Sequence, residues 1–169
     1  MRKTNKMTQG KMRKFTEERL RRIARAGEVF IDGEAFKGVP VDPGLYRGDD
    51  YRVDHEKFIT VKRALFKLKR LESGDVGVMT WRKFESDAVL TVVVDLDPTR
   101  TPVPGRHPVT PALAAAFEGR TEVQPLTING VPVLSVCAPI RDSLDDVVGA
   151  LEVFASLEPE RYQADRINY

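Results

Sequence analysis

The sequence predicts an α+β domain in which helices come first and an antiparallel sheet follows. Apolar residues recur with a helical period before Gly74, and they alternate with a period of two after it. The last three alternating segments are joined by a two-residue and a five-residue polar loop, which is typical of antiparallel neighbours. We therefore expect a single sheet with the helices on one side.

The composition is that of one globular domain. The chain has 169 residues, 41% of them hydrophobic and 31% charged, which is enough to bury a core. No window approaches 18 consecutive apolar residues, so no membrane span is expected. The basic start is not followed by an apolar segment, as a secretory signal would be. As written the chain is expected in the cytoplasm, or outside it if the chain is a domain excised from a receptor.

The charge is distributed unevenly. Residues 1–30 carry ten Lys/Arg against three Glu, a balance of +7, so the other 139 residues sum to −5. This pattern indicates either an arm for an acidic partner, a membrane or nucleic acid, or a solvated helix face. No nucleic-acid partner is expected, because no recognised binding motif accompanies the charge. We expect a flexible basic arm over 1–14, a single domain over 15–157 and a polar tail over 158–169.

Two helices are expected in the first half of the chain. The first is expected over 16–31, with Thr16 as its N-cap. The second is expected from a cap at Asp54 to a C-terminal stop at Gly74. Residues 37–50, which are rich in glycine and proline, are expected as a loop between them.

In the second half of the chain, the sequence predicts strands and one short helix. Five prolines hold 98–111 extended. Thr110 is then a good N-cap for a short helix that starts at Pro111 and stops at Gly119. Alternation predicts five strands: 76–83, 88–96, 122–128, 131–140 and 147–156.

Three stretches carry a family resemblance: IARAGEVFIDGEAF, AVLTVVVDLDP and TPALAAAFEGRTEVQPLTINGVPVLSVCAPIRDSLDDVVGALEVFASL. Over about residues 20–157 the chain resembles sensor domains of the Cache/PAS kind, single Cache type. The resemblance implies a five-stranded antiparallel sheet with long N-terminal helices and a short helix packed on it. GAF domains share the closing hairpin pattern and are the near competitor.

The resemblance implies a non-catalytic sensor domain of signal transduction. A small molecule, with a carboxylate as the first candidate, would bind between the sheet and the loops, and the N-terminal helix would transmit the signal. A homodimer or a signalling partner protein is expected. The alternative is a protein-interaction or dimerisation domain with the same fold and no ligand. The candidate ligand-binding residues are Trp81, Lys83, Arg100, Arg106, His107 and Ser135.

No catalytic residue, metal or cofactor is expected. Cys137 falls in an inner strand, where a buried, inert thiol is the usual arrangement. His55 begins a helix and is expected to be exposed and structural. The four aspartates that resemble oxygen ligands lack a glycine-bearing calcium loop and are interpreted as strand-end and turn carboxylates: Asp95, Asp97, Asp145 and Asp146.

Overall fold

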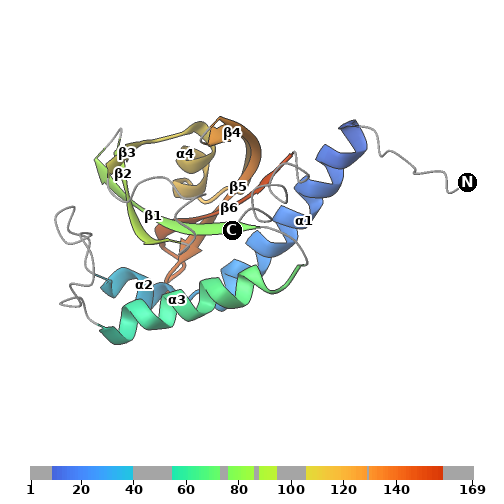
Figure 1. Ribbon diagram of the computed structural model, residues 1–169. Helices are drawn as coiled ribbons and strands as arrows, with labels where there is room; N and C mark the ends of the chain where they lie inside the picture. The colour runs from blue at the N-terminus through green and yellow to red at the C-terminus, as the bar shows by residue number, and fades with distance from the viewer. Residues whose placement is uncertain are drawn as a thin grey trace, which may run out of the picture.

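The computed structural model describes residues 9–39, 55–72, 76–85, 88–94, 106–128 and 130–157. In this part of the chain a six-stranded antiparallel sheet lies between helices on both of its faces (Figure 1). The strand order is β3-β2-β1-β6-β5-β4, and the α+β class is confirmed. The elements are α1 (Gln9–Phe30), α2 (Gly33–Gly38), α3 (His55–Lys69), β1 (Gly77–Glu85), β2 (Ala88–Val94), β3 (Arg106–Pro108), α4 (Pro111–Phe117), β4 (Glu122–Ile128), β5 (Val131–Arg141) and β6 (Val147–Ser156).

The sheet has one strand more than expected. The five predicted strands are present, and β3 adds a short strand at the edge beside β2, where His107 pairs with Val89. Proline holds this stretch extended, and an edge strand tolerates residues that cannot donate a ladder hydrogen bond. The proline-rich connection therefore ends by extending the sheet.

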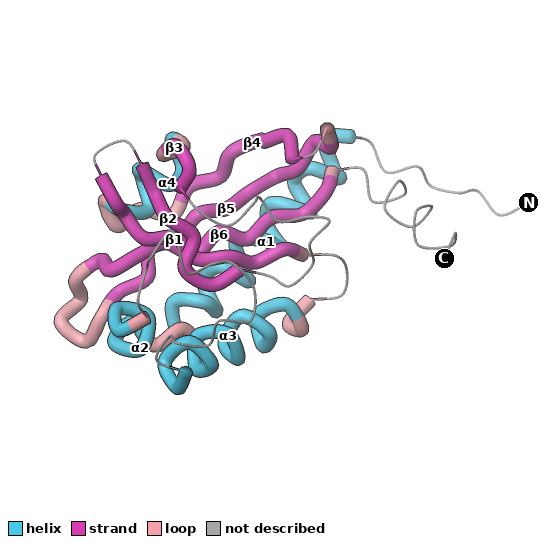
Figure 2. The backbone as a smooth tube through the Cα atoms, turned by 60° about the vertical axis from the view of Figure 1, so that its left-hand side comes forward, coloured by secondary structure: helices cyan, strands magenta, loops and turns pink. Residues whose placement is uncertain are grey.

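The prediction that all helices lie on one side of the sheet is wrong. Leu134 and Val136 of β5 face the core beneath α1, α2 and α3, whereas Cys137 faces α4. Both faces of the central strands are apolar, so each face needs a covering layer. Figure 2 shows α2 and α3 on one side of the strands and α4 on the other.

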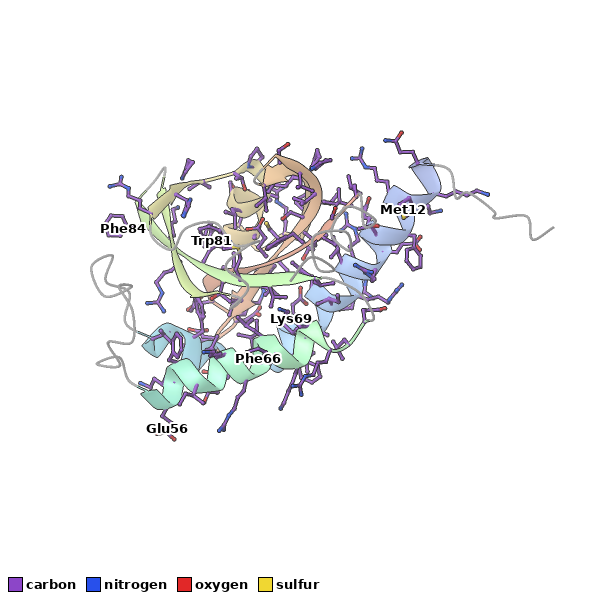
Figure 3. The ribbon with its side chains drawn as sticks, in the orientation of Figure 1. Met12, Glu56, Phe66, Lys69, Trp81 and Phe84 are labelled. Carbon is purple, nitrogen blue, oxygen red and sulfur yellow. The ribbon has the colours of Figure 1, made fainter. Side chains whose placement is uncertain are left out.

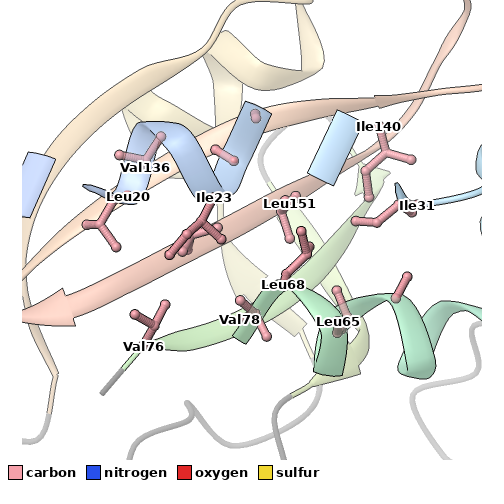
Figure 4. Packing of buried hydrophobic residues seen from close by; sticks show 14 of the residues in the cluster. Leu20, Ile23, Ile31, Leu65, Leu68, Val76, Val78, Val136, Ile140 and Leu151 are labelled. Carbon is pink, nitrogen blue, oxygen red and sulfur yellow. The ribbon is translucent and has the colours of Figure 1, made fainter. Parts of the chain in front are cut away.

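The core beneath α1 and α3 is built mainly from leucine, isoleucine and valine, with Phe36 and several alanines (Figure 4). Leu20 and Ile23 of α1 pack there with Leu68 of α3, and all three are fully buried. A Cβ atom at Gly27 would lie 2.2 Å from Leu151 Cδ2, so α1 approaches β6 closely at this glycine. This contact joins α1 directly to a central strand.

The first helix begins earlier than predicted. α1 starts at Gln9, and Thr16 is buried within it instead of capping it. The extra turns carry Lys and Arg, which are good helix formers. Figure 1 shows this end of α1 reaching past the sheet. Residues 1–8 of the expected basic arm lie outside the described residues.

The short helix α2 was not predicted, and it lies mostly before the segment 37–50 that was predicted as a loop. The rest of that segment, 40–50, lies outside the described residues. α2 begins at Asp32, whose side chain accepts hydrogen bonds from the backbone N–H groups of Glu34 and Ala35 at 2.9 and 3.2 Å. The guanidinium of Arg82 on β1 donates to the carbonyl of Phe36, which closes the other end of the helix. The expected end residues of the second helix, at 54 and 74, lie outside the described residues.

Candidate functional site

A buried polar group lies at the centre of the sheet, on the face that α4 covers. The Glu152 carboxyl on β6 accepts a hydrogen bond from the Trp81 indole Nε1 at 2.8 Å and from the Ser135 Oγ at 2.6 Å. These three side chains come from adjacent strands, β1, β6 and β5 (Figure 3 labels Trp81). With His107 they form what we call the Glu152 cluster: Trp81, His107, Ser135 and Glu152.

Glu152 is held in an environment that favours its neutral form. Its side chain is almost fully buried, and burial raises the pKa of this carboxyl above its ordinary value. The hydrogen bonds from Ser135 and Trp81 and the charge of His107 lower the pKa, but they only partly oppose burial. Each carboxyl oxygen has one of these donors, which leaves capacity for a further one.

His107 borders the cluster from the edge of the sheet. Its ring meets the Trp81 indole edge to face, with centroids 5.4 Å apart and an interplanar angle of 83°. This is a favoured arrangement of two rings. His107 is half-buried, whereas Trp81 is 3% exposed. The imidazole therefore lies between the buried cluster and solvent.

Cys137 is next to the cluster and is a neutral thiol. It lies opposite Glu152 in the β5–β6 ladder and is fully buried, with its Sγ 3.9 Å from the Ser135 Oγ. Burial and the nearby Glu152 carboxyl raise the pKa of Cys137 well above its ordinary value. The expected buried thiol is confirmed, and a protonated thiol is a poor nucleophile.

A second polar contact fixes α4 over this face. The Gln124 Oε1 accepts from the backbone N–H of Ala112 at 3.1 Å, and its Nε2 donates to the Thr110 Oγ1 at 2.9 Å. Thr110 accepts from the N–H of Leu113, so the predicted N-cap is confirmed. The side chains of Ala112 and Leu113 then pack against the apolar part of the sheet face.

Three of the six candidate ligand-binding residues meet in the Glu152 cluster: Trp81, His107 and Ser135. Lys83 follows Trp81 by two positions on β1, so it shares that face, and it is exposed. Arg106 precedes His107 on β3, and its exposed guanidinium lies over the Phe84 ring with Cζ 5.4 Å from the centroid. Arg100 lies outside the described residues.

Glu152 was missed by the sequence analysis, although a signal for it exists. It is the one charged residue in the strand VVGALEVFAS, whose other side chains are apolar or small. In a strand with both faces covered, a carboxylic acid has to find buried partners. Its partners lie far away in the chain, 71 residues for Trp81 and 17 for Ser135.

No metal-binding group of three or more His, Cys, Asp or Glu side chains occurs among the residues that the structure describes. Asp145 and Asp146 lie in the exposed turn before β6, in agreement with a turn role, and residues 95 and 97 lie outside the described ranges. In the same part of the chain, none of the helices combines the length and the apolar character needed to cross a bilayer.

Fold and site together define an α+β domain with an antiparallel sheet covered on both faces and a buried polar cluster between the sheet and the short helix α4. No protein-family model and no curated protein matches the sequence.

Among solved structures, the chain is similar to the sensory domain of the Campylobacter jejuni chemoreceptor Tlp3 (CcmL), at 14% identity and a TM-score of 0.47 over 88% of this chain and 56% of that one. It is also similar to the periplasmic sensory domain of the C. jejuni chemoreceptor Tlp1, at 8% identity and a TM-score of 0.43 over 95% of this chain and 60% of that one. A Tlp3 sensory domain with isoleucine bound matches at 11% identity and a TM-score of 0.40, over 90% and 64%. The chain thus spans less than two thirds of the length of each of these domains.

Proposed function

We propose that this chain is a non-catalytic sensor domain that binds a small molecule at the Glu152 cluster. The buried carboxyl of Glu152 is the observation that carries the proposal. A carboxylic acid at the centre of a largely apolar sheet lowers stability unless it has hydrogen-bond partners, and an apolar residue would fill the position at no such cost. Perturbed carboxyls of this kind are concentrated at functional sites.

The chemistry of the cluster supports a ligand that donates hydrogen bonds. A ligand amine or ammonium would use the remaining acceptor capacity of Glu152, and a cation would also favour the ionised carboxylate. Lys83, exposed on the same face of β1, is a candidate partner for a carboxylate at the other end of such a ligand. The proposed ligand therefore keeps the carboxylate that was predicted from the sequence. Arg100 and Arg106 are the other candidate partners for this carboxylate.

The signal would pass from the cluster to α1 through β6. Glu152 faces α4, and its neighbour Leu151 faces the opposite side, where it packs against Gly27 of α1. A ligand that prefers one position of β6 would shift the population of α1 positions that fit against it. A second copy of the chain, paired through α1, or a signalling protein would then read that shift.

A protein-interaction domain with the same fold and no ligand is the second candidate. It is favoured by the close filling of the sheet face under α4, where Met79, Leu113 and Phe154 are all buried.

A cytoplasmic location stays the prediction from the sequence, with an extracytoplasmic one as the alternative for a domain of a longer receptor.

Thermal-shift screening with amines, amino acids and small organic acids tests the proposal. A ligand that binds only the folded chain raises the melting temperature, by an amount equivalent to about 2.7 kcal/mol at a concentration of 100 Kd. The shift should be lost in Glu152→Gln and kept in Glu122→Gln, which removes a charge from a half-buried position on β4 outside the cluster. A complete absence of shifts, together with a stable dimer in solution, would favour the interaction domain.

A further inference from the structure

Helix α3 forms an outer edge of the molecule and is strongly basic. Its fifteen residues include five Lys/Arg and one Glu. Val61, Leu65 and Leu68 face the core, so the opposite side of the helix points outward. In Figures 1 and 2 no described element covers that side.

Apolar and basic side chains are mixed on this outward side. Ile59, Arg63 and Phe66 of α3, and Arg70 in the turn directly after it, follow one another at intervals of four, three and four residues, which places them in one row. Ile59 and Phe66 are 36% and 39% exposed, and Figure 3 shows Phe66 on the outer helix. With the flanking lysines they form what we call the α3 outer face: Ile59, Lys62, Arg63, Phe66, Lys67 and Arg70.

Among the described residues, the cations of this face differ from those of α1 in their ion pairing. On α1, Arg21 and Arg22 form ion pairs with Glu17 and Glu72 at 3.0 and 2.8 Å. Within the described ranges, by contrast, no ion pair engages the side chains of Arg63, Lys67 or Arg70. An external anionic partner would supply the missing counter-charge.

We propose that the α3 outer face binds the surface of an anionic lipid bilayer. Phe66 and Ile59 would enter the boundary between head groups and acyl chains, and the basic side chains beside them would contact lipid phosphates. Lipid fits better than nucleic acid, because Ile59, the first residue of the row, gains burial in the acyl boundary and finds no partner along a phosphodiester backbone. This binding is separate from the Glu152 cluster, which lies across the sheet.

Co-sedimentation of the full chain with vesicles tests this proposal. We expect binding to phosphatidylcholine vesicles that contain phosphatidylglycerol, weaker binding to phosphatidylcholine alone, and release by salt. Replacing Arg63, Lys67 and Arg70 together by glutamine should lower the partition coefficient roughly a hundredfold, because each cation near an anionic surface contributes about fivefold. Phe66→Ser should also weaken binding, with the salt dependence unchanged.

A matched control replaces Lys11, Arg13 and Lys14 of α1 by glutamine, with the same loss of charge. Circular dichroism verifies that each variant is folded. The proposal predicts that the α1 variant keeps most of its affinity. It is overturned if the two triple variants lose affinity equally, if wild type does not bind the anionic vesicles at low salt, or if an oligonucleotide binds more tightly through the same residues without dependence on Phe66.

Discussion

The indole of Trp81 on β1 donates a hydrogen bond of 2.8 Å to the Glu152 carboxyl on β6, across two neighbouring central strands. Each group is almost inaccessible to water, so the indole depends on Glu152 for its polar partner, and the carboxyl depends on Trp81 and Ser135. The pair also joins β6, which contacts α1, to β1, which lies between β6 and β2. The predictions below concern this pair and the contacts that hold the covering helices in place.

Glu152→Gln should remove a pH dependence of stability. The pKa of Glu152 is raised above its ordinary value of 4.5 in the folded chain, so between 4.5 and the raised pKa folding takes up a proton. The free energy of unfolding of wild type therefore falls as the pH rises through this window. Urea unfolding at a series of pH values measures this effect. Above pH 4.5 the free energy of unfolding of the variant should rise relative to that of wild type, and the difference should then level off. A difference independent of pH would contradict the raised pKa.

Trp81→Phe should destabilise the fold by about 1–3 kcal/mol, because it removes one of the two donors to a buried carboxyl. The same substitution should cost less in a Glu152→Leu background, where no acceptor is left without a partner. Denaturant unfolding of the four proteins measures this coupling. Equal costs in both backgrounds would show that the hydrogen bond contributes nothing and that Trp81 acts by packing alone.

Gly33→Ala should destabilise the fold by about 1–3 kcal/mol, as overpacking of a tight contact does. A Cβ atom at Gly33 would lie 1.9 Å from the backbone carbonyl oxygen of Arg141, and backbone cannot move aside as a side chain can. Gly10→Ala is the matched control, since a Cβ atom there meets nothing within 4 Å, and it should stabilise α1 by up to about 1 kcal/mol. Thermal unfolding compares the stabilities of the two variants. A Gly33→Ala variant as stable as wild type would contradict the close contact between α2 and the Arg141 carbonyl.

Thr110→Ala should cost about 1 kcal/mol, because the hydroxyl caps α4 and also accepts from Gln124. Thr110→Ser keeps the oxygen and should stay close to wild type. Chemical denaturation distinguishes the two variants. If both lose the same stability, the methyl group of Thr110 matters and the cap does not.

Local signals account for the parts of the fold that the sequence predicts well. The cap at Thr110, the stop at Gly119 and the apolar runs of β5 and β6 depend on residues close together in the chain. The α+β class and the final antiparallel strands follow from them. A local pattern of this kind can be recognised in the sequence without knowing which segments pack against it.

Contacts between distant segments account for what was missed. α2 has only six residues and depends on partners such as Asp142, whose carboxylate lies 2.9 Å from the Lys37 Nζ although the two are 105 positions apart. A helix this short is not stable by propensity alone. The Glu152 cluster also depends on contacts between distant segments, since only the strand order brings Trp81 and Ser135 to the carboxyl.

The emission of Trp81 provides the most direct test of a small-molecule site at the Glu152 cluster, because the chain contains a single tryptophan. Compounds that raise the melting temperature would be titrated into wild type and Glu152→Gln while the fluorescence spectrum is recorded. A saturable change in wild type, with an affinity at least about tenfold weaker in the variant for a lost charge-assisted hydrogen bond, is the predicted result. Stabilising compounds that leave the Trp81 emission unchanged, or bind both proteins equally, would place the ligand elsewhere and contradict the proposal.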